Sequence, residues 1–312
     1  MKKIYIILPL FFLLILISIS ISIFSFEEES SIGVNPKIEA IYYGSYQEKL
    51  NAVHYIGSEK IMAGLRPIID QLEKRQKGEL NLNPDLVARM CTTLGRLKHP
   101  AGNAILLDLA DSSKKRITAL LELDKKSKKE PPQKKDGEEF VTTFSNLDYR
   151  LEAEGEFIIG INALRALGDL DIASGVDKLK AVVSDKSEFM EFRVAALKAL
   201  PNTTFSDDKL IGIIEKILED EKYDYLKVQA AYTLLFKDGT HPAARKKLIE
   251  LLGSSDYEVR RDVALAMMEL KMSAFVVPLE EAIKIEDDER IRSILLKAEH
   301  ECKYYIKCCR HP

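Results

Sequence analysis

Apolar, small and charged residues recur along this chain in a pattern that repeats about every 33 residues. The clearest copies are Phe192–Leu200, Leu226–Leu234 and Val259–Met267, with weaker copies at Gly160–Leu167 and Ile291–Ala298. In four of the copies the same position is basic, and the residues there are Arg193, Lys227, Arg260 and Arg292. They follow each other at intervals of 34, 33 and 32 residues. A fixed period of this length predicts an all-α protein, an α-α superhelix of about seven helix pairs.

The boundaries of single helices follow from apolar spacing and from cap residues. Gln47–Ile56 is predicted to be the first helix of the first pair, and Ser58 is predicted to cap the second, which runs to about Lys74. Glycines are predicted to end the first helices at equivalent places, namely Gly57, Gly95 and Gly168. Second helices of the later units are predicted at 172–183, 207–218, 242–252 and 273–285.

Acidic residues mark the start of the later first helices. Asp256 and Asp288 stand where a helix begins, and a carboxylate there interacts favourably with the helix dipole. Each also lies four residues before a basic residue of the repeat, Arg260 or Arg292, which is the spacing of an ion pair within a helix.

The period is interrupted once. Leu94 and Leu167 occupy equivalent positions 73 residues apart, about one unit too many. The extra residues begin with a separate predicted helix, Ser113–Asp124, and continue into Lys125–Lys135, which has six lysines, two prolines and no large apolar residue. This composition predicts a flexible Lys/Pro-rich insertion at about 124–150. A solvated insertion is favoured over an arm that binds an anion or a partner.

The N-terminal stretch has the pattern of an export segment. Lys2 and Lys3 precede Ile4–Phe26, an uncharged run long enough to span a bilayer. Residues 1–26 are therefore predicted to be a signal peptide or an N-terminal membrane anchor, and both alternatives stay open. Residues 27–44 are predicted to be a linker and residues 45–312 the repeat array. The array is expected in the periplasm or cell envelope, because the positive N-terminal flank stays in the cytoplasm.

The sequence Val-Arg-x-x-Ala-Ala-x-x-Leu in helix pairs of about 33 residues resembles HEAT repeats, most closely the short bacterial kind. The resemblance covers roughly residues 45–300 and implies that the small residues let helices approach closely: Ala195, Ala196, Ala230, Ala231 and Ala264. It also implies that the basic residue bonds to turns of neighbouring units. Second helices of this family line a concave surface that binds partners. The corresponding polar residues are Lys178, Glu215, Lys216, Arg245, Lys246, Glu281 and Lys284.

Charge and composition point to a protein partner. The seven candidate residues carry both signs, which suits a protein or peptide better than a polyanion. The whole chain has 46 basic and 49 acidic residues, and this balance argues against nucleic acid as the main partner. The function expected is a non-catalytic scaffold for protein–protein interaction, with the membrane as a second partner if the N-terminal segment is not cleaved.

Enzymatic alternatives find little support in the residues. Deoxyhypusine hydroxylases share the repeat and bind iron through several His-Glu pairs, whereas this chain has the single pair His300-Glu301. Bilin lyases share it too, but no residue set here carries their activity over. No phosphate-binding loop, nucleophile elbow or His-Glu-x-x-His sequence is present, so no cofactor is expected.

The C-terminal tail groups soft side chains: His300, Cys302, Cys308, Cys309 and His311. Their spacing matches no Cys-x-x-Cys pattern, so free thiols are favoured over a metal site. A disulfide between Cys302 and Cys308 or Cys309 stays open, given export. The fourth cysteine, Cys91, is predicted to be a small buried apolar residue.

Overall fold

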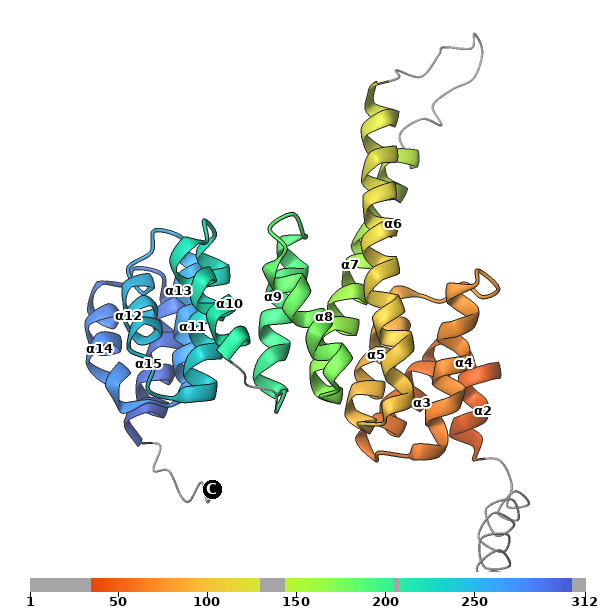
Figure 1. The fold of residues 1–312 in the computed structure, drawn as a ribbon, viewed down its shortest axis with the longest axis horizontal. Helices are drawn as coiled ribbons and strands as arrows, with labels where there is room; N and C mark the ends of the chain where they lie inside the picture. Colours follow the sequence, from red (N-terminus) through yellow and green to blue (C-terminus); the bar gives the residue numbers. More distant parts are fainter. Residues whose placement is uncertain (1–34, 130–143, 205–207, 305–312) are drawn as a thin grey trace, which may run out of the picture.

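The computed structural model describes residues 35–129, 144–204 and 208–304, and within these ranges every regular element is helical (Figure 1). Fourteen α-helices follow one another in these ranges: α2 (Pro36–Tyr43), α3 (Tyr46–Ser58), α4 (Leu65–Gln76), α5 (Pro84–Leu97), α6 (Asn103–Lys129), α7 (Phe144–Leu170), α8 (Ala173–Ser184), α9 (Met190–Ala199), α10 (Asp208–Asp220), α11 (Asp224–Asp238), α12 (Pro242–Leu251), α13 (Tyr257–Leu270), α14 (Val276–Ile285) and α15 (Glu289–Tyr304). The predicted all-α architecture is confirmed.

The helices form two layers. The first helices of the units, α3, α5, α7, α9, α11, α13 and α15, pack on one another in chain order. The second helices α4, α6, α8, α10, α12 and α14 form the other layer, and α2 packs against α3 and α4. Six helix pairs are thus flanked by α2 and α15 within the described residues. A solenoid of this kind buries one continuous core between the layers, and each unit contacts only its neighbours.

The glycines predicted to end the first helices lie inside them instead. They are Gly57 in α3, Gly95 in α5 and Gly168 in α7. Each is a point of close approach to the next first helix: a methyl group at Gly168, for example, would lie 2.5 Å from the backbone oxygen of Ala199. The small residues of the repeat do the same further on, because Ala196 and Ala230 are fully buried. Small side chains therefore set the spacing of the first-helix layer.

The actual ends of several first helices are residues in the left-handed conformation. Lys98, Asp171 and Lys271 follow α5, α7 and α13 with φ of 51°, 55° and 50°, and Gly239 follows α11 with φ of 71°. This conformation reverses the chain into the second helix. Glycine was predicted at the ends of the first helices, but of these four residues only Gly239 is a glycine.

The start of the chain also differs from the prediction. Helix α2 lies within residues 27–44, which the sequence assigned to a linker, and its Ile41 is fully buried. Asn35 caps this helix and Pro36 occupies its first position. The second helix of the first pair begins at Leu65 rather than at Ser58, because a 3-10 turn at Met62–Gly64 precedes it.

A projecting arm accounts for the interruption of the period. Helices α6 and α7 have 27 residues each and extend side by side beyond the body of the solenoid (Figure 1). The helix predicted at Ser113–Asp124 is present, but it is the continuation of α6 and not a helix of its own. Of the insertion predicted at 124–150, residues 124–129 and 144–150 are helical, and 130–143 lie outside the described residues.

A buried carboxylate fixes the base of this arm. Glu156 of α7 accepts hydrogen bonds from Arg75 of α4 at 2.5 Å, Arg116 of α6 at 3.2 Å and Ser113 of α6 at 3.1 Å. Arg75 and Glu156 are both less than a tenth exposed. The three helices are thus held at one point by a charged network whose members all have partners.

Candidate functional site

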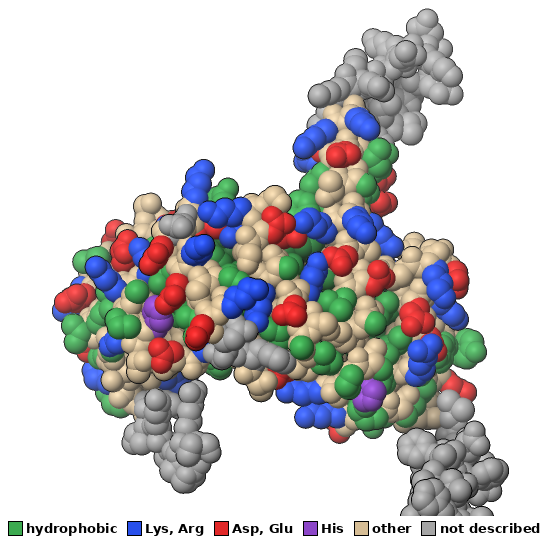
Figure 2. Space-filling model, in the orientation of Figure 1, with side chains coloured by type: hydrophobic (Ala, Val, Ile, Leu, Met, Phe, Trp, Pro, Cys, Tyr) green, Lys and Arg blue, Asp and Glu red, His purple; other side chains and the backbone are tan. Residues whose placement is uncertain are grey.

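The seven candidate residues from the sequence all lie on second helices, as predicted. Lys178 is on α8, Glu215 and Lys216 on α10, Arg245 and Lys246 on α12, and Glu281 and Lys284 on α14. Charges of both signs are interspersed over the face drawn in Figure 2. The structure brings these residues into the same layer but gathers them into no single cluster.

Three of the seven are engaged inside the protein. Lys178 pairs with Asp111 of α6. Glu215 accepts from His241 at 3.0 Å, and the other ring nitrogen of His241 accepts from the first turn of α12, so its Nε2 is the donor. Arg245 donates to the backbone oxygen of Thr240 at 3.3 Å. These contacts join neighbouring second helices or cap them.

The other four are Lys216, Lys246, Glu281 and Lys284, which are exposed and make no hydrogen bond or ion pair among the described residues. Lys216 borders a cavity of about 340 Å³ between α8, α9 and α10. The wall of this cavity also holds Arg193 and Glu221, which are already bonded to each other. The four exposed charges remain available to a partner.

The basic residues of the repeat are structural, as the resemblance implied. Arg193 donates from Nε to the backbone oxygen of Val183 at 3.2 Å and pairs with Glu221 at 2.7 Å. Val183 lies at the end of α8, just before the turn into α9, and Glu221 lies just after α10. Arg193 therefore bonds on both sides of the helix pair α9 and α10. Lys227 departs from this arrangement, because its ammonium bonds to Asp224 in its own helix at 3.1 Å.

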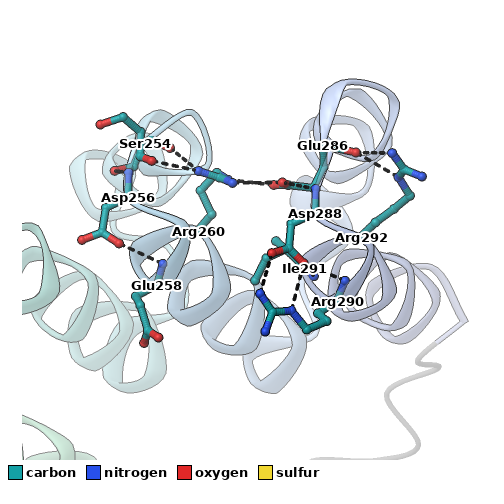
Figure 3. A network of polar contacts seen from close by, with 10 residues as sticks. Ser254, Asp256, Glu258, Arg260, Glu286, Asp288, Arg290, Ile291 and Arg292 are labelled. Carbon is teal, nitrogen blue, oxygen red and sulfur yellow. Dashed lines mark hydrogen bonds and ion pairs between the residues drawn. The ribbon is translucent and has the colours of Figure 1, made fainter.

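Arg260 repeats the arrangement of Arg193 at the C-terminal end, and Arg292 repeats only its bond to the preceding turn (Figure 3). Arg260 donates to the backbone oxygen of Ser254 at 2.9 Å and binds both carboxylate oxygens of Glu286, at 2.7 and 2.9 Å. Arg292 then donates to the backbone oxygen of Glu286 at 3.0 Å. The hydrogen bond from Arg260 lowers the pKa of the Glu286 carboxyl, so this group stays ionised.

The predicted ion pairs of Arg260 with Asp256 and of Arg292 with Asp288 are wrong. Asp256 caps α13 by accepting from the backbone of Glu258 at 2.9 Å. Asp288 bonds the guanidinium and the backbone nitrogen of Arg290 instead. The carboxylates complement the helix dipole, as expected, and are therefore not free to turn toward the basic residue one helical turn later.

A groove on the first-helix layer was not predicted. It measures about 450 Å³ and is lined by Ile161, Arg165, Met190, Glu191, Val194, Ala195, Tyr225, Gln229, Glu258 and Asp262. These residues come from α7, α9, α11 and α13, which lie in a row (Figure 1). The tyrosine hydroxyl, that of Tyr225, donates to Asp256 at 3.1 Å, and burial raises its pKa to about 12. Apolar and charged side chains both line the groove.

The repeat itself holds a signal for this groove. Aligned on Arg193, Lys227 and Arg260, the position two residues earlier is Glu191, Tyr225 and Glu258, and the position two residues later is Ala195, Gln229 and Asp262. All six line the groove. Positions four apart share a helix face, and these differ between copies while the packing positions stay small or apolar.

The described cysteines are buried thiols. Burial raises the pKa of Cys91 to about 12 and that of Cys302 to about 11, so both are protonated at neutral pH. The Sγ of Cys302 donates to the backbone oxygen of Met267 at 3.3 Å. Cys308 and Cys309 lie outside the described residues, as does His311, and the predicted alternatives for the tail therefore stay predictions.

The described residues contain neither a group of metal-binding side chains nor a helix that could span a membrane. Nowhere in 35–129, 144–204 and 208–304 do three or more histidine, cysteine, aspartate or glutamate side chains group so that they could hold a metal ion. Over the same ranges, none of the helices has the length and apolar character needed to cross a membrane. Ile4–Phe26, the predicted export segment, falls outside them.

Comparison with known proteins agrees with the repeat architecture. Residues 214–298 match the family model described as HEAT repeats. A search of the curated proteins found no match. Among solved structures the chain is similar to the complex of CpcE and CpcF of phycocyanin lyase from Nostoc sp. PCC7120, at 16% identity and a TM-score of 0.50, over 90% of this chain and 92% of that one. Human deoxyhypusine hydroxylase in complex with glycerol is similar at 14% identity and a TM-score of 0.33, over 85% and 83% of the two chains, which is too weak to argue from. These likenesses concern the fold.

Proposed function

The chain is a HEAT-like repeat protein, and we propose that it is a non-catalytic scaffold that binds a protein partner. The observation that carries this proposal is that some charged residues are bonded inside the protein, whereas others are exposed and have no internal partner. The arginines of the repeat, Arg193, Arg260 and Arg292, are engaged in bonds to the turns, so they are not available for chemistry. What remains exposed is a long surface of mixed charge, which suits recognition of another protein.

We propose further that the scaffold acts outside the cytoplasm. Lys2 and Lys3 before the uncharged run Ile4–Phe26 support this location, because positive flanking charge resists translocation. A reporter that is active only outside the cytoplasm, fused after Pro312, should give a signal. Activity of a cytoplasmic reporter at that position would refute export. N-terminal sequencing of the mature protein then separates a cleaved signal, with cleavage near Ser22 or Ser25, from a retained anchor.

Partner binding is tested by capture from the native envelope fraction with the full chain. We expect one protein to co-purify in fixed proportion. A matched variant reverses the exposed second-helix charges, with Lys216→Glu, Lys246→Glu, Glu281→Lys and Lys284→Glu; because none of these residues has a described partner inside the protein, its melting temperature should be unchanged. The proposal fails if no protein is enriched over an unrelated membrane-tethered control.

The similar CpcE–CpcF structure is itself a complex of two chains, which is consistent with a protein partner. A role as an accessory of an enzyme would appear in the same capture experiment, as an enzyme among the co-purified proteins. No arrangement of side chains in the described residues favours that alternative over simple scaffolding.

A further inference from the structure

The groove on the first-helix layer has the shape and the polarity of a peptide-binding site. Its volume of about 450 Å³ lies within the range of ligand pockets, and it crosses four helices rather than closing around one point. Its apolar lining includes Ile161, Met190 and Val194, and Met190 is 36% exposed.

Gln229 is the residue that points to a ligand. It is only 7% exposed, and its side-chain amide makes no hydrogen bond among the described residues. Its backbone oxygen is used, since it accepts from Thr233 at 2.8 Å. The amide is not among the side-chain atoms sealed from solvent without a partner, and Gln229 lines the groove, so its amide is open to a ligand there. A primary amide both donates and accepts, which is the complement of a peptide group.

The charged residues that line the groove indicate which charge a ligand should carry. Glu191 is exposed and makes no ion pair among the described residues. Glu258 and Asp262 share one guanidinium, that of Arg261, at 2.6 and 2.9 Å. Even when the guanidinium of Arg261 is counted with Arg165 of the lining, the three carboxylates outnumber the two basic groups at the described groove. An excess of carboxylate favours a cationic side chain in the partner.

We propose that this groove binds an extended, basic segment of a partner protein, with an aliphatic side chain against Ile161, Met190 and Val194, a backbone amide on Gln229 and a lysine or arginine against Glu191. This inference rests on the proposed scaffold function and adds the binding face and the chemistry of the segment. It places recognition on the first helices, whereas the sequence placed it on the second.

The probes are capped, fluorescein-labelled peptides in which Lys-Ser-Leu-Ser-Lys is flanked by Gly-Ser. Alternation puts leucine and both lysines on one side of an extended chain. Anisotropy titrations with the full chain in detergent should give saturable binding. The peptide with glutamate in place of both lysines, and the one with serine in place of leucine, should bind at least tenfold more weakly.

Protein variants separate a binding role from a structural one. Gln229→Leu should weaken the lysine–leucine peptide about fivefold, the effect of one neutral hydrogen bond, without lowering the melting temperature, because no internal bond is lost. Glu191→Lys should weaken the same peptide, while the second-helix control Lys216→Glu should leave its affinity unchanged. Absence of peptide binding, equal binding of the glutamate peptide, or a lowered melting temperature of Gln229→Leu with unchanged affinity would each overturn the inference.

The capture experiment keeps the two proposals apart. If a partner co-purifies and is lost only on reversal of the second-helix charges, while Gln229→Leu and Glu191→Lys retain it, the scaffold function holds and the groove inference fails. If nothing co-purifies, the scaffold proposal itself fails. Loss of the partner with the two groove variants alone supports both.

Discussion

Replacement of Arg193 should destabilise the array strongly, because this side chain joins two consecutive turns while it is 4% exposed. Its guanidinium lies 2.7 Å from Glu221, which is 9% exposed, and 3.2 Å from the backbone oxygen of Val183. At that separation and an effective dielectric constant of about 20, the gross attraction of the pair is about 6 kcal/mol. Desolvation of both ions offsets most of it, so the intact pair adds little net stability.

Removal of one partner has a different cost. Arg193→Met keeps the aliphatic part of the side chain but leaves the Glu221 carboxylate buried without its counter-charge. The expected loss of unfolding free energy is about 3–5 kcal/mol, a large share of the roughly 5–15 kcal/mol typical of folded proteins. The measurement is urea unfolding followed by circular dichroism, with the midpoint and slope compared between variants.

Two further variants make this test specific. Arg290→Met removes an ion pair with Asp288 in which the Arg290 side chain is 82% exposed, so it should cost far less than Arg193→Met. Arg193→Met combined with Glu221→Leu removes both buried charges and should recover most of the loss. The reasoning is refuted if Arg193→Met costs no more than Arg290→Met, or if the double variant is no more stable than the single one.

Two more predictions concern packing and acid stability. Gly168→Ala should lower the free energy of unfolding by about 1–3 kcal/mol, since the added methyl meets the backbone of Ala199 at 2.5 Å. Gly212→Ala, whose added methyl meets nothing within 4 Å, should raise it by up to about 1 kcal/mol through helix propensity. Melting temperatures of the two variants that shift in the same direction would contradict this. Arg260 lowers the pKa of Glu286 from its ordinary 4.5, so the stabilisation is complete above about pH 4.5 and is lost as the pH falls through the lower folded-state pKa. Glu286→Gln should flatten that part of the acid-unfolding profile, and an unchanged slope would count against the pairing.

The repeat architecture could be predicted because its cause is local and periodic. Small residues recur where first helices touch, and the basic residue recurs where turns are bonded, so one alignment of the chain with itself reveals the fold. The arm could not be predicted in the same way. Apolar spacing in Ser113–Asp124 indicates a helix, but it does not tell a separate helix from a continuation of α6. That distinction depends on α7 being long enough to pack beside it.

The ion-pair partners of the repeat arginines could not be predicted from sequence spacing either. Asp256 stands four residues before Arg260, yet Arg260 bonds to Glu286, 26 residues later. The choice follows from competition, because the cap of α13 and the hydroxyl of Tyr225 both use the Asp256 carboxylate. A rule based on spacing cannot register which neighbour has already taken an acceptor. The groove was missed for a related reason, since its walls come from four helices that meet only in the folded solenoid.

Comparison between copies of the repeat suggests where specificity resides. Residues that fix the solenoid are constrained in every unit, because a larger side chain at Ala196 or Ala230 would separate first helices that touch. The position two residues after the basic one varies more in size and polarity: it is Ala195, Gln229 and Asp262 in successive units, and all three line the groove. A face assembled from such positions can change its ligand without changing its packing. Gln229, whose side-chain amide makes no hydrogen bond among the described residues, is the variable position that offers a ligand both a donor and an acceptor.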